Sequence, residues 1–231
     1  MNTERVVLKK RLDELVNVGL FFQKISGIDV NEIPEQYVDD VTDAQEILKK
    51  YAEIAIVYKV CDIKSRGENE VILEGDLNLS GQMPPKILKD STQLVTCLIT
   101  LQGFTEAAQQ SEDIMIEYFL DSWGSAYVEC AQAWLGKHIK EELKKAGFKR
   151  THLWSPGQHR FDLINQRTLF DILKPEDVGC TLNESCLMIP VKSGSGIWGI
   201  IDKDVENVLL PCDFCSFGAT CPASKRGCAE L

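Results

Sequence analysis

The sequence has little basic charge and no long apolar segment, and each shortage removes a class of function. Its 231 residues carry 25 Lys and Arg against 35 Asp and Glu, a net charge of −10. A nucleic-acid binder needs a basic face to meet phosphates, and docking on anionic lipid needs basic clusters. No apolar run approaches the roughly 18 residues that a membrane-spanning helix requires. We therefore expect neither a nucleic acid nor a membrane as partner.

Familiar enzyme motifs are missing as well. The chain has no phosphate-binding glycine motif, no His-Glu-x-x-His and no Gly-x-Ser-x-Gly. Charges at Glu4, Arg5 and Lys9 interrupt the N-terminus before the apolar core of a signal peptide could form. We therefore expect a cytoplasmic protein. In that reducing compartment the 9 cysteines predict metal binding, catalysis or burial rather than disulfides.

The N-terminal part of the sequence predicts helices followed by strands. Apolar residues from Val6 to Leu20 are spaced as on an amphipathic helix. A capping box at Thr42–Gln45 predicts the start of a second helix, which runs to about Ala55. The β-branched residues of segments 56–63 and 71–79 predict two extended stretches.

The middle of the chain predicts two further helices. Asp90-Ser91-Thr92 is a suitable cap for a helix that runs through Leu101 and stops at Gly103. The longest helix is expected over residues 111–147, with Gly124 marking a close approach by another group. Its apolar stripe has near i, i+4 spacing and consists of Met115, Phe119, Trp123, Tyr127 and Cys130.

The C-terminal third changes character. Asp162 can cap a short helix through Leu173, and residues 178–201 alternate strand-like segments with a Gly/Ser turn at 193–196. Because helices and strands do not alternate as regular βαβ units, we predict an α+β fold with a helical N-terminal region. Residues 1–205 are expected to form one domain, and residues 206–231 a cysteine-rich tail.

The tail contains the strongest motif of the sequence, a C-x2-C-x5-C-x6-C arrangement that can surround one metal centre. Two thiolates three residues apart can bind one ion, because a tight turn directs both sulfurs inward. The spacing is too compact for a zinc ribbon and closer to that of iron–sulfur proteins, although four-sulfur zinc stays possible. The alternative is a tail of free thiols. The predicted metal ligands are Cys212, Cys215, Cys221 and Cys228.

The other five cysteines are predicted to be small buried hydrophobes. Cys97 and Cys130 are expected on helices, and Cys61, Cys180 and Cys186 in strands.

The order of residues in the C-terminal third resembles the activation domain of cobalamin-dependent methionine synthase, in its short stand-alone form. The similarity is densest over residues 155–200, from Ser155-Pro156-Gly157 to the Gly-Ser-Gly segment. A weaker similarity at residues 121–129 corresponds to the central helix of that family, and some stand-alone members also end in a cysteine-rich tail. The resemblance implies a twisted antiparallel sheet with flanking helices.

The same resemblance implies a role in corrinoid chemistry. The domain of that family binds S-adenosylmethionine and presents its methyl group to cob(II)alamin on a partner, while an electron donor reduces the cobalt. Leu153 and Gln158 stand where the family has the Arg and Tyr of its ligand loop. The residues that the resemblance places at the cofactor are Ser155, Pro156, Gly157, Gln158, Glu184, Ser185, Gly196 and Trp198.

Two functions follow as hypotheses. The first is an accessory protein that docks a cobalamin protein, with the S-adenosylmethionine role of the family retained, weakened or lost. Its tail would carry a metal centre, which could relay an electron if it is an iron–sulfur cluster. It would not be a complete enzyme alone, because the chain has no recognisable substrate domain or general base. The alternative is a non-catalytic binding or scaffold module with a structural zinc site.

Overall fold

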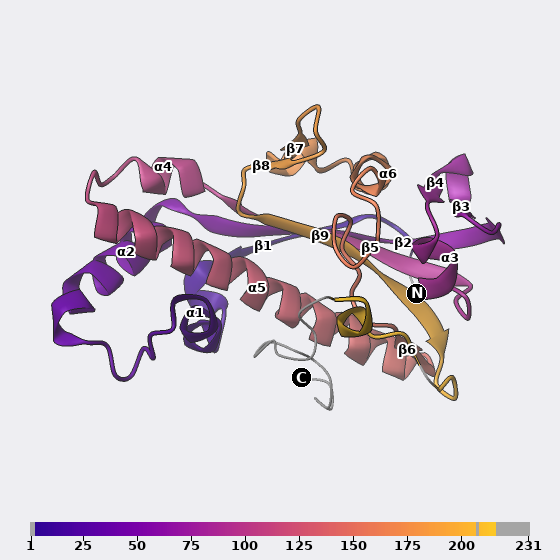
Figure 1. The fold of residues 1–231 in the computed structure, drawn as a ribbon, viewed down its shortest axis with the longest axis horizontal. Helices are drawn as coiled ribbons and strands as arrows, with labels where there is room; N and C mark the ends of the chain where they lie inside the picture. The colour runs from indigo at the N-terminus through magenta and orange to yellow at the C-terminus, as the bar shows by residue number, and fades with distance from the viewer. Residues whose placement is uncertain (1–2, 207, 216–231) are drawn as a thin grey trace.

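A single antiparallel sheet organises the molecule, and the structure, a computed structural model, describes residues 3–206 and 208–215. The strand order is β4-β3-β2-β5-β9-β6, and β1 pairs with β2. Helices lie on both sides of the sheet, with α5 along one side and α6 on the other (Figure 1). The predicted α+β fold with an antiparallel sheet and flanking helices is therefore confirmed. The strands are β1 (Val6–Arg11), β2 (Glu53–Arg66), β3 (Glu70–Leu73), β4 (Asn78–Ser80), β5 (Gln93–Gln102), β6 (Phe148–Arg150) and β9 (Ser193–Asp202), with a separate hairpin of β7 (Thr181–Leu182) and β8 (Met188–Ile189).

The helices vary widely in length, and α5 spans 32 residues. None of the helices in the described part of the chain is both long and apolar enough to cross a membrane. The helices are α1 (Val18–Ser26), α2 (Val38–Tyr51), α3 (Met83–Ile87), α4 (Phe104–Ala108), α5 (Ile114–Lys145) and α6 (Asn165–Leu173), with short 3-10 turns η1 (Leu12–Glu14), η2 (Glu35–Tyr37), η3 (Glu74–Asp76), η4 (Pro175–Val178) and η5 (Pro211–Phe214).

Helix α5 anchors the larger hydrophobic cluster. Its start is fixed by Asp113, whose carboxylate accepts hydrogen bonds from two first-turn amides. The predicted stripe is confirmed, because Phe119, Trp123, Tyr127 and Cys130 are buried. The Trp123 ring stacks on Phe22 of α1 at 3.9 Å between centroids, and its indole N–H donates to a carbonyl of α2. These contacts hold α1 and α2 against α5 on one face of the sheet.

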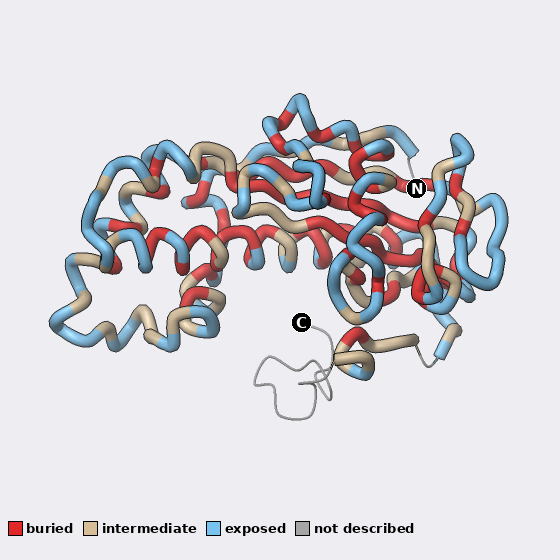
Figure 2. Tube along the Cα trace, turned by 45° about the horizontal axis from the view of Figure 1, so that its top comes forward, coloured by how far each residue is buried: buried red, intermediate tan, exposed pale blue. Residues whose placement is uncertain are grey.

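The predicted helix through Leu101 is wrong, because residues 93–102 form the central strand β5. This strand is paired on both sides and its residues 94–101 are all buried, as is most of the middle of the sheet (Figure 2). A segment that is buried on both faces has no apolar period by which strand and helix can be told apart. Cys97 therefore lies on a strand rather than on a helix.

The predicted opening helix is also wrong, since residues 6–11 form β1 along the edge of β2. The burial of β1 alternates residue by residue, as expected for a strand with one face on the core. The second helix begins at Val38 rather than at a cap on Thr42. Thr42 lies inside α2, where its hydroxyl donates to the Val38 carbonyl at 2.7 Å. The helical N-terminal region thus consists of α1 and α2, preceded by a strand.

Gly103 provides a stability test of the fold. It follows β5 with a φ of 78°, and an added Cβ would collide with the Tyr51 carbonyl. Gly147 has a similar φ of 83°, but an added Cβ there meets nothing within 4 Å. We expect Gly147→Ala to cost about 1 kcal/mol of unfolding free energy from its left-handed backbone. Gly103→Ala should cost about 1–3 kcal/mol more through the collision. Urea unfolding measures both, and equal losses would contradict the packing described at Gly103.

Candidate functional site

The candidate site begins at one edge of the sheet, where residues 148–154 run alongside β9. Strand β6 pairs antiparallel with the end of β9. The pairing continues through Thr151, whose amide donates to the Gly199 carbonyl at 2.9 Å, and whose hydroxyl accepts from the Gly199 amide at 2.8 Å. It ends at a bridge between Trp154 and Ile197, with hydrogen bonds of 3.0 and 2.9 Å. The pairing therefore places Ser155 beside Gly196.

Gly196 makes this crossing possible. A Cβ on Gly196 would lie 2.7 Å from both the Trp154 carbonyl oxygen and Leu153 Cδ1. No other residue type fits at this position without moving the 153–154 segment. The predicted Gly/Ser turn at 193–196 is wrong, because these residues form the first part of β9. The glycines here serve close packing rather than a chain reversal.

The Ser155–Gln158 loop is a tight turn with an exposed tip. Gly157 has a φ of 87°, which glycine adopts readily, and its amide donates to the Phe161 carbonyl at 2.7 Å. The Phe161 amide in turn donates to the Gln158 carbonyl at 2.8 Å. His159 and Arg160 follow with left-handed φ values of 49° and 65°. Two such non-glycine residues in succession hold backbone strain of about 1–2 kcal/mol each, which is typical of functional loops.

The edge of β9 next to this loop has no partner strand among the described residues, although Ser195 and Gly196 are buried. Backbone groups alternate direction along a strand, so Ser195 directs its N–H and C=O to the same side as Ile197. In the described part of the sheet, pairing on that side runs from Asp202 back to Ile197 and is not found between Ile197 and the start of β9. On the α5 side, a Cβ on Gly194 would lie 3.3 Å from the Gln132 side-chain oxygen. This combination of backbone and amide groups suits a polar organic ligand.

Trp198 lies close to this edge but faces α5. Its side chain is 2% exposed, and the Arg150 guanidinium covers its ring at 5.6 Å. Arg150 is held in turn by hydrogen bonds from Nε to the Gly136 carbonyl and from Nη1 to the Thr151 carbonyl. Trp198 therefore fixes the distance between β9 and α5 behind the Ser155–Gln158 loop.

Glu184 and Ser185 lie on a separate element. Both are exposed at the tip of the β7–β8 hairpin, and Arg167 of α6 donates to the Glu184 carbonyl at 3.0 Å. The structure thus brings Ser155–Gln158 together with Gly196, places Trp198 behind them, and sets Glu184 and Ser185 on a hairpin that is tied to α6.

A lysine that the sequence analysis missed joins three elements near the start of β9. The Lys192 ammonium donates to the Ser125 hydroxyl at 2.8 Å and pairs with the Asp121 carboxylate at 2.7 Å. It also lies 5.5 Å from the centre of the Phe104 ring. That ring is the group approaching Gly124, as expected, with 2.8 Å to an added Cβ. Asp121 and Ser125 were recognised on the helix, but no local pattern predicts a partner 67 residues away from Ser125.

The cysteines fall into two groups. Five are buried, and burial raises the pKa of the Cys61 and Cys130 thiols to about 11. Cys212 and Cys215 are half-exposed and share the turn η5, while Cys221 and Cys228 lie outside the described residues. Within residues 3–206 and 208–215, no cluster of three or more metal-binding side chains is found. Burial of the five supports their prediction as small hydrophobes, and the metal site stays a prediction.

Substitution of Gly196 tests the geometry of this site. We expect Gly196→Ala to cost about 1–3 kcal/mol of unfolding free energy by overpacking against Leu153 and Trp154. The amides of Trp154 and Ile197 should also lose protection from hydrogen exchange. Gly194→Ala is the matched control, because its Cβ lies 3.3 Å from the end of the flexible Gln132 side chain and in ordinary contact with Val128 at 3.7 Å. Unchanged protection of both amides in Gly196→Ala would refute the described crossing.

Comparisons with known proteins find a match in structure but not in sequence. No protein-family model and no curated protein matches the chain. Among solved structures, the crystal structure of the MetH reactivation domain bound to AdoHcy matches with a TM-score of 0.61 and 13% identity. The match covers 90% of this chain and 81% of that one. The chain therefore has the fold of that reactivation domain, and the predicted resemblance is confirmed at the level of the fold.

Proposed function

We propose that this protein binds S-adenosylmethionine or AdoHcy and supports the reactivation of a cobalamin-dependent methyltransferase. The observation that carries the proposal is the match over 90% of the chain to a reactivation domain bound to AdoHcy. The predicted ligand loop also lies beside the unpaired edge of β9, which supports the proposal. A cobalamin-binding module is the partner that such a role requires.

The proposed ligand site combines the Ser155–Gln158 loop, Gly196 and the open edge of β9. The Ser155 hydroxyl and the exposed Gln158 amide would bond polar groups of the ligand. The backbone of Ser195 would extend this contact as the edge of a sheet does. Leu153 packs against the core and Gln158 has no aromatic face, so neither position supplies the arginine or the tyrosine of the family's ligand loop. Its ligand recognition would therefore depend on backbone and amide groups. Glu184 and Ser185 would approach the ligand from the β7–β8 hairpin, and Trp198 would support the site from behind β9.

Calorimetric titration with AdoHcy tests this proposal. Saturable binding is expected, and Gln158→Ala should weaken it by about two- to tenfold through the loss of one hydrogen bond. Gln109→Ala, at an exposed position after α4, is the matched control and should bind as the parent does. The absence of binding at millimolar AdoHcy, in a protein with an intact fold, would refute the proposed function.

We further propose that the cysteine tail holds a metal centre. The half-exposed thiols of Cys212 and Cys215 share one turn, with the Cys215 amide 3.4 Å from the Cys212 carbonyl. A C-x2-C pair on one turn can bind one ion, and Cys221 and Cys228 would complete a four-sulfur set. An iron–sulfur cluster there would supply an electron carrier, whereas zinc would supply a structural site.

Metal analysis of anaerobically purified protein distinguishes these possibilities. Iron with labile sulfide is expected for a cluster, and zinc without sulfide for a structural site. Cys212→Ser and Cys215→Ser should each reduce the bound metal to a small fraction while leaving the sheet folded. Cys186→Ser, at a buried cysteine outside the tail, should retain the metal in full. Metal-free parent protein, or full metal content in both tail variants, would contradict this assignment.

A further inference from the structure

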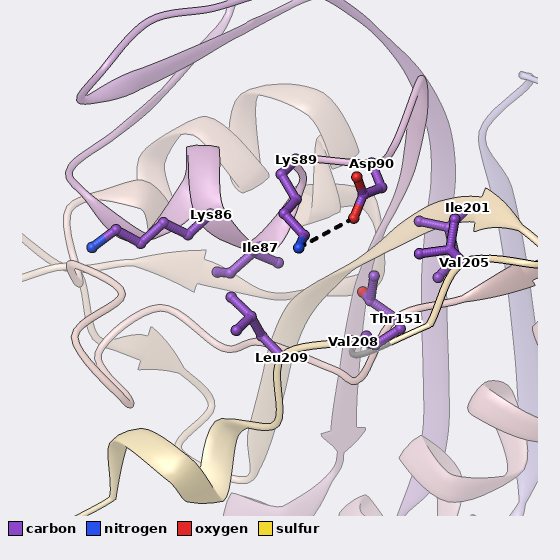
Figure 3. A pocket seen from close by; sticks show the side chains of 9 residues that line it. All are labelled: Lys86, Ile87, Lys89, Asp90, Thr151, Ile201, Val205, Val208 and Leu209. Atoms are coloured by element: carbon purple, nitrogen blue, oxygen red, sulfur yellow. Dashed lines mark ion pairs between the residues drawn. The ribbon is translucent and has the colours of Figure 1, made fainter.

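The last described segment, residues 208–215, packs along the edge that leads to the Ser155–Gln158 loop. We call this segment the strap. Leu209 and Phe214 pack against the hydrophobic cluster on the α6 side, and Pro211 is buried. Figure 3 shows Val208 and Leu209 beside Ile87 and Thr151, around a small hollow. The strap therefore packs against the hydrophobic core, although it follows the last strand of the sheet.

A chain of aromatic rings connects the strap to the loop. Phe214 meets Trp154 with 5.7 Å between ring centroids and an interplanar angle of 61°. Trp154 meets His159 at 6.2 Å and 89°. Both contacts have the edge-to-face geometry that aromatic pairs favour. Trp154 therefore stands between the turn of the strap and the strained residue that follows Gln158.

The position of Trp154 depends on this packing. Its side chain is 1% exposed, yet its indole N–H has no hydrogen-bond partner among the described residues. A buried indole is normally held by such a bond as well as by its ring contacts. Packing alone positions the indole, and Phe214 is one of the groups that restrain its ring.

The two half-exposed cysteines flank Phe214 in the same turn. Cys212 and Cys215 are linked through the Cys215 amide and the Cys212 carbonyl. A group attached to either thiol, or an ion shared by both, would act directly on the short turn that holds Phe214. A change in the shape of this turn alters the contact between Phe214 and Trp154, because Phe214 lies between the two cysteines in the same turn.

We infer that the strap couples the chemical state of Cys212 and Cys215 to the order of the Ser155–Gln158 loop, through Phe214 and Trp154. The two states are a strap docked on Trp154 and a strap released from it, and the cysteines and the loop each bias this equilibrium. The inference rests on the proposed function only in treating the loop as a ligand site. The predicted change in the order of the loop does not depend on whether the loop binds a ligand.

Alkylation combined with amide hydrogen exchange, followed by NMR, tests the inference. In a Cys221→Ser/Cys228→Ser protein, iodoacetamide should form sulfur–carbon bonds at Cys212 and Cys215 with loss of iodide, which mass spectrometry verifies. The buried cysteines are shielded. The Gly157 and Phe161 amides, which close the loop, should then exchange about two- to tenfold faster through the weakened ring contact. Phe214→Ala should produce the same rise and remove any further response to alkylation.

Controls separate a local release from general unfolding. Tyr118→Ala truncates a half-exposed aromatic side chain elsewhere and should leave both amides unchanged. Protection of the Leu98 amide in β5 reports on the fold, and Phe214→Leu replaces Phe214→Ala if that protection is lost. Unchanged Gly157 and Phe161 exchange after alkylation, thiols that do not react, or a full response in Phe214→Ala would each overturn the inference. Failure of AdoHcy to bind the same samples would refute the proposed function and leave the exchange result standing.

Discussion

The arrangement around β9 depends on how closely backbone can approach this strand. Strand β9 is paired with β5 on one side and with the 148–154 edge on the other, and α5 covers one of its faces. Gly196 and Gly199 each stand where a Cβ would lie 2.7 Å or less from a neighbour. Their missing side chains allow the edge to end at Trp154 and the loop to begin beside an open stretch of β9. The candidate site is thus a consequence of packing.

Elements with a clear period were predictable from the sequence, and fully buried ones were not. Helix α5 showed its stripe because one face meets the core and the other meets solvent. Strand β5 is buried on both faces, so its apolar run satisfied a helical interpretation equally well. The residues at Thr42 match a capping box, but the helix already begins at Val38. Local hydrogen-bonding potential therefore predicted a helix there but not its boundary.

The candidate site was predictable only in part, because some of its contacts join segments that are distant in the sequence. The Ser155–Gln158 loop and Gly196 were identified through the resemblance to the activation domain, and their role at a ligand stays a prediction. The pairing of Lys192 with Asp121, and the ring contact of Phe214 with Trp154, join segments that are distant in the sequence. Such contacts follow from the topology of the sheet, which a single sequence does not specify. The resemblance predicted the fold because the members of a family share their topology.

The central claim is that the loop beside the open edge of β9 is a ligand site. A crystal structure of the protein grown with AdoHcy tests it most directly. The account predicts density for AdoHcy against Ser155–Gln158 and the β9 edge at Ser195 and Gly196. Density for AdoHcy elsewhere on the protein, with this edge empty, would contradict the account.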